Sequence, residues 1–168
     1  MRGVGGASLA LPQAVDADPR RARVHAALLA DRRPLWPGGA LALPHVPWTP
    51  GFARAVHGAW RRGQVVLGFE RAEAVLASER AGLALLRARG QRLGTRVSRL
   101  LLLARDGSAR LARQVERLAR EHGARLLVLA VDVTAAELAS VVGAEGRQVK
   151  LVLVTHRQAV AAVLLGLA

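Results

Sequence analysis

The sequence predicts an α/β protein, a three-layer α/β/α sandwich with a small mixed sheet, preceded by an irregular N-terminal segment. Three observations lead to this fold class. Apolar residues make up 52% of the 168 residues, which is enough to bury a core. From residue 64 onward, short apolar runs typical of strands alternate with amphipathic stretches typical of helices. Strands separated by helices of this length predict a sheet covered by helices.

Four apolar runs are expected to form the strands: residues 64–67, 99–104, 125–131 and 149–155. The helices are expected at residues 69–78, 109–122, 135–142 and 158–167. Local signals mark the helix ends. Ser108 and Thr134 stand at N-cap positions, and Glu137 completes a capping box with Thr134. Gly123 and Gly143 stand where the second and third of these helices should end.

The chain before residue 52 has weaker patterns. Residues 1–20 are interpreted as a mobile arm and residues 21–51 as a small Pro/Gly-rich segment, leaving the main domain at residues 52–168. Residues 21–30 fit one short helix, whereas residues 34–50 contain five prolines and two glycines, which disfavour regular structure. Only short extended pieces around residues 40–43 are expected there. A helix is expected again at residues 52–62.

Residues 81–98 are ambiguous. The apolar residues within 82–87 fit either a short strand or a continuation of the preceding helix, and periodicity does not separate these for so short a run. The segment therefore stays open between a helix, a strand and an insertion.

The charge balance indicates a polyanionic partner. The net charge is +13, from 25 Lys and Arg against 12 Asp and Glu, and Lys150 is the one lysine. A GC-rich genome explains arginine in place of lysine, but it does not explain a twofold excess of bases over acids. Guanidinium groups bind phosphate oxygens in pairs and stack on bases, so nucleic acid is the expected partner.

Several classes of function are disfavoured by what the sequence lacks. There is no cysteine, so disulfides and thiol chemistry are excluded, and the five histidines have no metal-ligand spacing. No phosphate-binding loop, dinucleotide fingerprint or serine nucleophile elbow occurs. We therefore expect no enzyme activity, no cofactor and no metal. No apolar run reaches the length of a membrane span, so a cytoplasmic location without membrane contact is expected.

The order of elements from about residue 52 to residue 168 resembles the archaeal kink-turn-binding ribosomal proteins and their small bacterial relatives. Residues 63–70 (GQVVLGFE) look like the turn entering that family's RNA-contacting helix. Residues 99–108 (RLLLLARDGS) look like its second strand and the following cap, and residues 134–139 (TAAELA) like its short helix beside the RNA. Residues 151–165 look like its last strand and helix. The resemblance implies binding of structured or ribosomal RNA.

Three features depart from that family. Phe69 stands at the position of its RNA-reading Asn, and Glu73 stands at the position of a Lys, although Glu70 matches. Residues 81–98 look like an insertion.

In some bacteria a related domain follows a small YlxR-type domain, and residues 21–62 are interpreted as a degenerate version of it. The glycine-arginine signature of that domain is absent, and residues 45–48 (HVPW) stand near its position.

The sharpest local feature is the run from Arg80 to Arg113, which contains nine arginines and one acid, Asp106. It fits either an RNA-contacting surface or the solvated face of helices, and we favour the first because like charges repel unless a polyanion neutralises them. The candidate RNA-binding residues share a basic character or a place beside the expected RNA turn. They are Arg61, Arg62, Gln64, Gly68, Glu70, Arg71, Arg87, Arg89, Arg92, Arg96, Arg99, Val133 and Thr134.

Three alternatives remain open beside RNA binding. The same charge suits a DNA-binding or nucleoid protein, which is the less favoured of the two nucleic-acid partners. The chain also fits a substrate-binding domain detached from an RNA-modifying enzyme, or an α/β enzyme with its site at the strand ends. The sequence does not indicate which RNA is bound or how many copies of the chain assemble.

Overall fold

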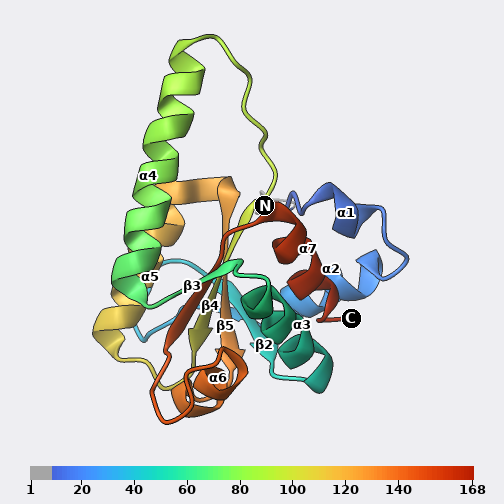
Figure 1. Ribbon diagram of the computed structural model, residues 1–168, viewed down its shortest axis with the longest axis vertical. Coiled ribbons are helices and arrows are strands. Elements are labelled where there is room, and N and C mark those ends of the chain that lie inside the picture. Colours follow the sequence, from blue (N-terminus) through green and yellow to red (C-terminus); the bar gives the residue numbers. More distant parts are fainter. Residues whose placement is uncertain (1–8) are drawn as a thin grey trace, which may run out of the picture.

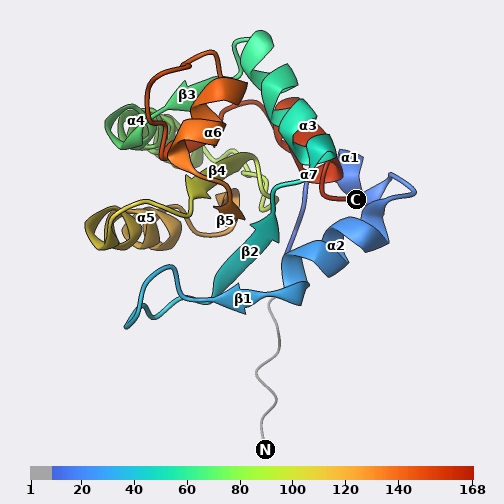
Figure 2. The same cartoon turned by 90° about the horizontal axis from the view of Figure 1, so that it is seen from below.

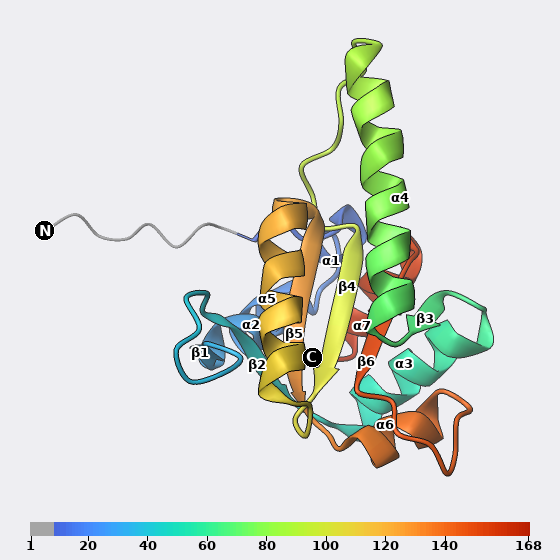
Figure 3. The same ribbon diagram turned by 90° about the vertical axis from the view of Figure 1, so that its left-hand side faces the viewer.

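One open sheet of six strands runs through the protein (Figure 1), and Figure 3 shows the strands in their order, β1-β2-β5-β4-β6-β3. The computed structural model describes residues 9–168. Strands β2, β5 and β4 are parallel, β6 is antiparallel to β4, and each edge strand is antiparallel to its neighbour, so the sheet is mixed as predicted. The strands are β1 (Arg32–Arg33), β2 (Leu43–Pro47), β3 (Val65–Leu67), β4 (Arg99–Ala104), β5 (Leu126–Asp132) and β6 (Leu151–Val154).

Helices cover both faces of this sheet, which confirms the predicted α/β sandwich (Figure 2). Helices α4 and α5 pack on one face, and α2, α3, α6 and α7 contribute to the core on the other, together with the short α1. The helices are α1 (Gln13–Asp16), α2 (Arg21–Ala30), α3 (Pro50–Arg61), α4 (Phe69–Ala88), α5 (Ala109–His122), α6 (Ala135–Val141) and α7 (Arg157–Leu165), with a 3-10 turn at Gly123–Arg125.

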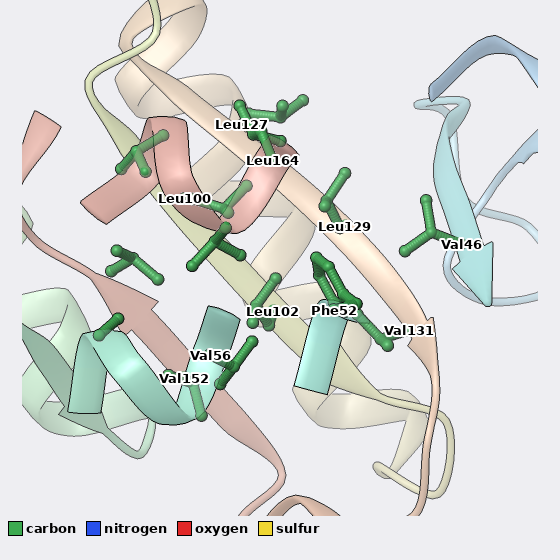
Figure 4. Packing of buried hydrophobic residues seen from close by; sticks show 14 of the residues in the cluster. Val46, Phe52, Val56, Leu100, Leu102, Leu127, Leu129, Val131, Val152 and Leu164 are labelled. Carbon is green, nitrogen blue, oxygen red and sulfur yellow. The ribbon is translucent and has the colours of Figure 1, made fainter. Parts of the chain in front are cut away.

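The apolar strands serve both cores because their side chains alternate between the two faces. In β4, Leu100 and Leu102 join the cluster that contains Phe52 of α3 (Figure 4), whereas Leu101 and Leu103 join the cluster under α4 and α5. All four leucines are at most 6% exposed. Burial on both faces explains why this strand is a continuous apolar run in the sequence rather than an alternating one.

The N-terminal segment has more regular structure than the sequence predicts. Residues 1–8 of the expected arm lie outside the described residues, but Leu11 and Val15 are fully buried in the core that α7 shares. Residues 21–30 form the expected helix α2. The strand β2 lies within the segment where prolines disfavoured one, and it pairs in parallel with β5.

The prolines of β2 are compatible with the strand because of where they fall in the ladder. The register with β5 begins at His45, one residue after Pro44, and it ends at Pro47 itself. His45 donates its backbone N–H to Asp31 on the other side of the strand. A proline that lies at the end of a ladder removes few hydrogen bonds, which is why such positions tolerate it.

The ambiguous segment is a helix followed by a loop, and it stands out from the rest of the molecule (Figures 1 and 3). Helix α4 runs on to Ala88, ten residues beyond its expected end, and residues 89–98 return to β4. None of residues 80–96 is buried, and we call them the projection. Although α4 has 20 residues, no helix within residues 9–168 is both long and apolar enough to cross a membrane.

Candidate nucleic-acid interface

The arginines divide into those with an acidic partner in the chain and those without one. Residues 9–168 contain 23 arginines, and nine of them form an ion pair with Asp or Glu. The paired arginines are Arg20, Arg21, Arg33, Arg96, Arg99, Arg105, Arg117, Arg120 and Arg125. The other fourteen have no carboxylate partner among the described residues. The positive charge that an external anion can meet is therefore carried by this second group.

Four arginines of the second group lie on the projection, which contains no acidic residue. They are Arg80, Arg87, Arg89 and Arg92, and all four are exposed. Leu85 between them is 63% exposed. Since neither a carboxylate nor a packed neighbour restrains these guanidinium groups, the projection presents a concentrated positive charge to the solvent.

The tip of the projection is shaped by Gly90. Its φ of 80° lies in the left-handed region, where glycine carries no steric penalty. The N–H of Gln91 donates to the carbonyl of Leu86 at 3.1 Å, and that of Gly90 donates to Arg87 at 2.9 Å, the pair of bonds that defines a Schellman motif. The motif ends α4 and turns the chain back, so Arg89 and Arg92 lie on either side of the turn.

Two candidate residues of the arginine-rich run have partners inside the protein. The Arg96 guanidinium donates to the carbonyl of Leu11 at 2.8 Å and to the carboxylate of Asp16 at 2.7 Å. Arg99 binds the Glu79 carboxylate through Nε at 2.8 Å, and Arg125 binds the same carboxylate. The side chains of Arg99 and Arg125 are each 20% exposed. These contacts assign Arg96 and Arg99 to the attachment of the projection rather than to its free surface.

A second group of candidates lies where β3 ends and α4 begins. Gly68 has a φ of 88° and donates its N–H to Leu151 at 3.0 Å, and a Cβ at this position would meet nothing within 4 Å. The glycine is therefore needed for its backbone conformation rather than for space. Glu70 and Arg71 follow it in the first turn of α4 and are both exposed. Phe69 instead packs against the core, with Arg117 6.0 Å from its ring centroid.

Arg61, Arg62 and Gln64 lie between the end of α3 and the start of β3, at the other end of this strand from Gly68. The guanidinium of Arg62 donates to the side chain of Gln64 at 3.2 Å. Arg61 and Arg62 line an open cavity of about 810 Å³ between α3 and α6, and Arg54 and His57 share it. The helix exposes these residues because Phe52, Val56 and Ala59, on its other side, are buried. The face is basic, since no Asp or Glu lines the cavity.

The remaining candidates, Val133 and Thr134, follow β5. Val133 is fully buried, so its side chain is not available to a ligand. Thr134 caps α6 by accepting the N–H of Glu137 at 3.1 Å, and its hydroxyl donates to the Glu137 carboxylate at 3.1 Å. The N-cap predicted at Thr134 is thus confirmed, but Glu137 contacts the hydroxyl of Thr134 rather than its backbone N–H, so only half of the predicted capping box forms. Thr134 lies three strand spacings from Gly68 across β4 and β6, about 14 Å at the usual separation.

The structure separates the candidate residues into two regions at opposite ends of α4. Gly68, Glu70 and Arg71 lie at its start, whereas Arg87 and Arg89 lie at its far end (Figure 3). A helix from residue 69 to residue 88 is about 28 Å long at roughly 1.5 Å per residue. One tight turn of a nucleic acid therefore cannot contact both regions, although an extended one can.

Comparisons with known proteins give no further indication of function. No protein-family model matches the sequence, and no curated protein matches it significantly. Within residues 9–168, no three His, Asp or Glu side chains are grouped so that they could hold a metal ion. The charge, the geometry and the order of elements are therefore the features that bear on function.

Proposed function

We propose that the protein binds RNA, and that the arginines of the projection make its main phosphate contacts. The main support for this proposal is that the projection has no acidic and no buried residue. It exposes four arginines without a carboxylate partner: Arg80, Arg87, Arg89 and Arg92. Charge repulsion makes such a segment costly unless a polyanion lies against it. Guanidinium groups on both sides of the Gly90 turn can approach a phosphate backbone from two directions.

The start of α4 is proposed as the second contact region. Arg61 and Arg62 precede the edge strand β3, and Arg71 lines a cavity beside this strand together with Trp60. The turn at Gly68, the Ser108 cap of α5 and the Thr134 cap of α6 occur in the order that the resemblance to the kink-turn-binding family implies. That order favours RNA over duplex DNA. Phe69 stands at the position of the family's RNA-reading Asn, but its side chain packs against the core and cannot take over that Asn's role. We therefore propose contact with the RNA backbone rather than recognition of kink-turns.

A salt series of RNA binding tests the main contact. Each phosphate contact contributes about 0.7 to 0.9 to the slope of log affinity against log salt. The triple variant Arg87→Ala, Arg89→Ala, Arg92→Ala should therefore lower the slope by about 2 to 3. The matched control removes three exposed arginines elsewhere, at positions 23, 32 and 110, and it should leave the slope nearly unchanged. Equal slopes for the projection variant and the wild type would reject the projection as the contact.

A competition experiment tests the choice of nucleic acid. Structured RNA and duplex DNA of equal length are competed at one fixed salt concentration. We expect the RNA to be bound more tightly. Tighter binding of the DNA would overturn the RNA proposal in favour of a DNA-binding protein, while leaving the projection as the phosphate contact.

A further inference from the structure

A cavity of about 710 Å³ lies at the carboxyl ends of the parallel strands β2, β5 and β4, and the proposed RNA contacts do not use it. It is lined by all three strands and by residues of α2 and α5. Ligands of open α/β sheets bind outside the carboxyl ends of parallel strands, and small-molecule sites usually measure about 300 to 1,000 Å³. Position and size therefore both fit a small organic ligand.

The interior of the cavity is apolar, and it is open because small residues line it where larger residues occur earlier in the same strand. On the α5 side of β5, Leu126 and Val128 are buried in the core, and Ala130 follows with a single methyl group. Ala112 of α5 faces the same space, and Leu35 and Leu103 complete an apolar lining. Such a lining accepts a flat, uncharged body.

The rim of the cavity carries two ion pairs. Arg105 donates to the Asp132 carboxylate at 2.7 Å, and Arg33 donates to Asp31 at 3.1 Å. The acids and bases that line the cavity therefore balance, in contrast to the projection, where four unpaired arginines face no acid. This balance disfavours selection of a bare phosphate. It suits a neutral ligand that offers both donors and acceptors.

The Arg105–Asp132 pair leaves hydrogen-bonding capacity on both partners. One guanidinium nitrogen is bonded to one carboxylate oxygen, so Nε and the second terminal nitrogen of Arg105 and the other oxygen of Asp132 have no partner among the described residues. Arg105 and Asp132 are about half or more exposed, at 54% and 69%, so a ligand can reach them. An arginine fork pairs with the O6 and N7 acceptors of guanine, and a carboxylate accepts from neighbouring N–H donors.

We infer that this cavity binds a guanine base, with its flat ring over Ala130 and its polar edge on Arg105 and Asp132. The base can come from a free nucleoside or nucleotide, or from an unpaired guanine of a bound RNA, which a protein reads by its hydrogen-bonding edge and by contact with its faces. The inference does not depend on the proposed phosphate contacts of the projection. It adds a site for base recognition that the projection lacks.

Titration of the full chain with nucleosides, followed by saturation-transfer NMR and calorimetry, tests the site. Guanosine should bind in a saturable way below about 1 mM, and adenosine should bind at least tenfold more weakly, because it lacks the carbonyl acceptor and the neighbouring N–H donors. Guanosine 5′-monophosphate should match guanosine within about twofold. Equal binding of guanosine and adenosine, or no saturation with either, would overturn the inference. So would competition by inorganic phosphate, because the site would then be an anion site.

Two variants connect the binding to the cavity. Asp132→Asn should weaken guanosine binding about tenfold or more without unfolding the chain, since the ion pair that it removes is exposed. Ala130→Leu should block binding by placing a branched side chain where the guanine ring is proposed to lie, and thermal unfolding checks that the variant folds. The triple arginine variant of the projection is the matched control and should bind guanosine like the wild type. If Asp132→Asn binds guanosine as tightly as the wild type, the Arg105–Asp132 pair does not contact the base, and the proposed site is wrong.

A final arm separates the two sources of the base. An RNA hairpin with one unpaired guanine is added to the guanosine complex, and the same hairpin with adenine at that position is the control. Displacement of guanosine by the first hairpin alone identifies the base as part of the RNA, whereas no displacement by either identifies a free nucleoside as the ligand. Loss of RNA binding in the projection variant with guanosine binding intact would show that the two sites act separately.

Discussion

The side chains of Arg96 and Asp16 lie eighty residues apart in the sequence and meet at 2.7 Å. The same guanidinium nitrogen donates to the carbonyl of Leu11, and the N–H of Val97 donates to Ala10 at 2.7 Å. These contacts attach the returning loop of the projection to the N-terminal segment, whose Leu11 and Val15 are buried. Arg96 thus has a structural role that Arg87, Arg89 and Arg92 lack, although the four arginines look alike in the sequence.

Replacing Arg96 should affect stability, whereas replacing Arg92 should affect RNA binding. Arg96→Ala removes a half-exposed ion pair and a hydrogen bond to a backbone carbonyl, which together contribute about 1 to 2 kcal/mol. Arg92→Ala removes no contact with the chain and should change the free energy of unfolding by less than about 0.5 kcal/mol. Urea unfolding of both variants measures the difference. Equal stability losses would contradict the role assigned to Arg96.

Glu116 of α5 holds the loop that joins β1 to β2. One carboxylate oxygen accepts the N–H groups of Ala40 and Leu41 at 2.7 and 2.8 Å, and the other accepts from the indole of Trp36 at 3.3 Å. The N–H of Leu41 is the largest cause that holds the pKa of Glu116 below its usual value, with smaller effects from Ala40 and Trp36, while burial opposes them. The carboxylate therefore stabilises the folded protein in its charged form.

Glu116→Gln should cost about 2 kcal/mol at neutral pH, since hydrogen bonds to a charged group are worth about 1.5 to 3 kcal/mol. A group with a lowered folded-state pKa contributes its full stability above its unfolded pKa and loses it as the pH falls through the folded value. The stability gap between wild type and variant should therefore narrow below the usual glutamate value of 4.5. Urea unfolding at several pH values measures the gap. A gap that stays constant on acidification would argue against the charged carboxylate.

The features that the sequence predicts correctly depend on local chemistry. Ser108 and Thr134 accept backbone N–H groups three residues ahead, and such caps are visible in any short window of sequence. The strands β4 and β5 are apolar runs close to their expected bounds. The arginine density of the projection is likewise a property of consecutive residues, so the sequence locates it.

The features that the sequence does not predict depend on contacts between residues that are distant in the chain. Strand β2 forms because β5 offers a parallel edge, which outweighs the propensity of a proline-rich segment against a strand. Helix α4 continues past its packed face to Ala88, where burial no longer contributes to the pattern. The acids that pair with Arg96 and Arg99 are distant in sequence, at Asp16 and Glu79. Nothing local indicates Glu116 as the anchor of a loop about seventy-five residues earlier.

Gly143 should be far less tolerant of substitution than Gly146, although both have a positive φ, at 66° and 80°. A Cβ at Gly143 would overlap the Trp60 ring, whereas a Cβ at Gly146 would meet nothing within 4 Å. Gly146→Ala should cost about 1 to 2 kcal/mol from the left-handed backbone alone. Gly143→Ala adds the overlap and should cost about 3 kcal/mol or more. Equal midpoints of urea unfolding for the two variants would exclude close packing of Trp60 on Gly143.

Among the acidic residues of α4, Glu79 should cause the largest loss of stability when it is replaced by Ala. Glu73 on the same helix is the matched control. The carboxylate of Glu79 is shared by Arg99 and Arg125, whose side chains are each 20% exposed, so Glu79→Ala leaves two poorly solvated guanidinium groups without their carboxylate. Removing one partner of a buried ion pair costs about 3 to 5 kcal/mol, and partial exposure places this case near the lower end. Glu73 pairs with Arg117 in an exposed position, where solvent screens the charges, so Glu73→Ala should lower the stability far less than Glu79→Ala.

Hydrogen exchange provides a local measurement for this prediction, because the hydrogen bonds of Glu79 join α4 to Arg99 of β4 just before the projection begins. In Glu79→Ala, the amides of residues 80–88 should exchange faster, since the helix beyond the lost ion pair has no buried side chain to hold it against the sheet. Glu73→Ala should leave their exchange unchanged. If both variants exchange like the wild type, the projection is stabilised by its own helical hydrogen bonds, and the Glu79 cluster anchors only the start of β4.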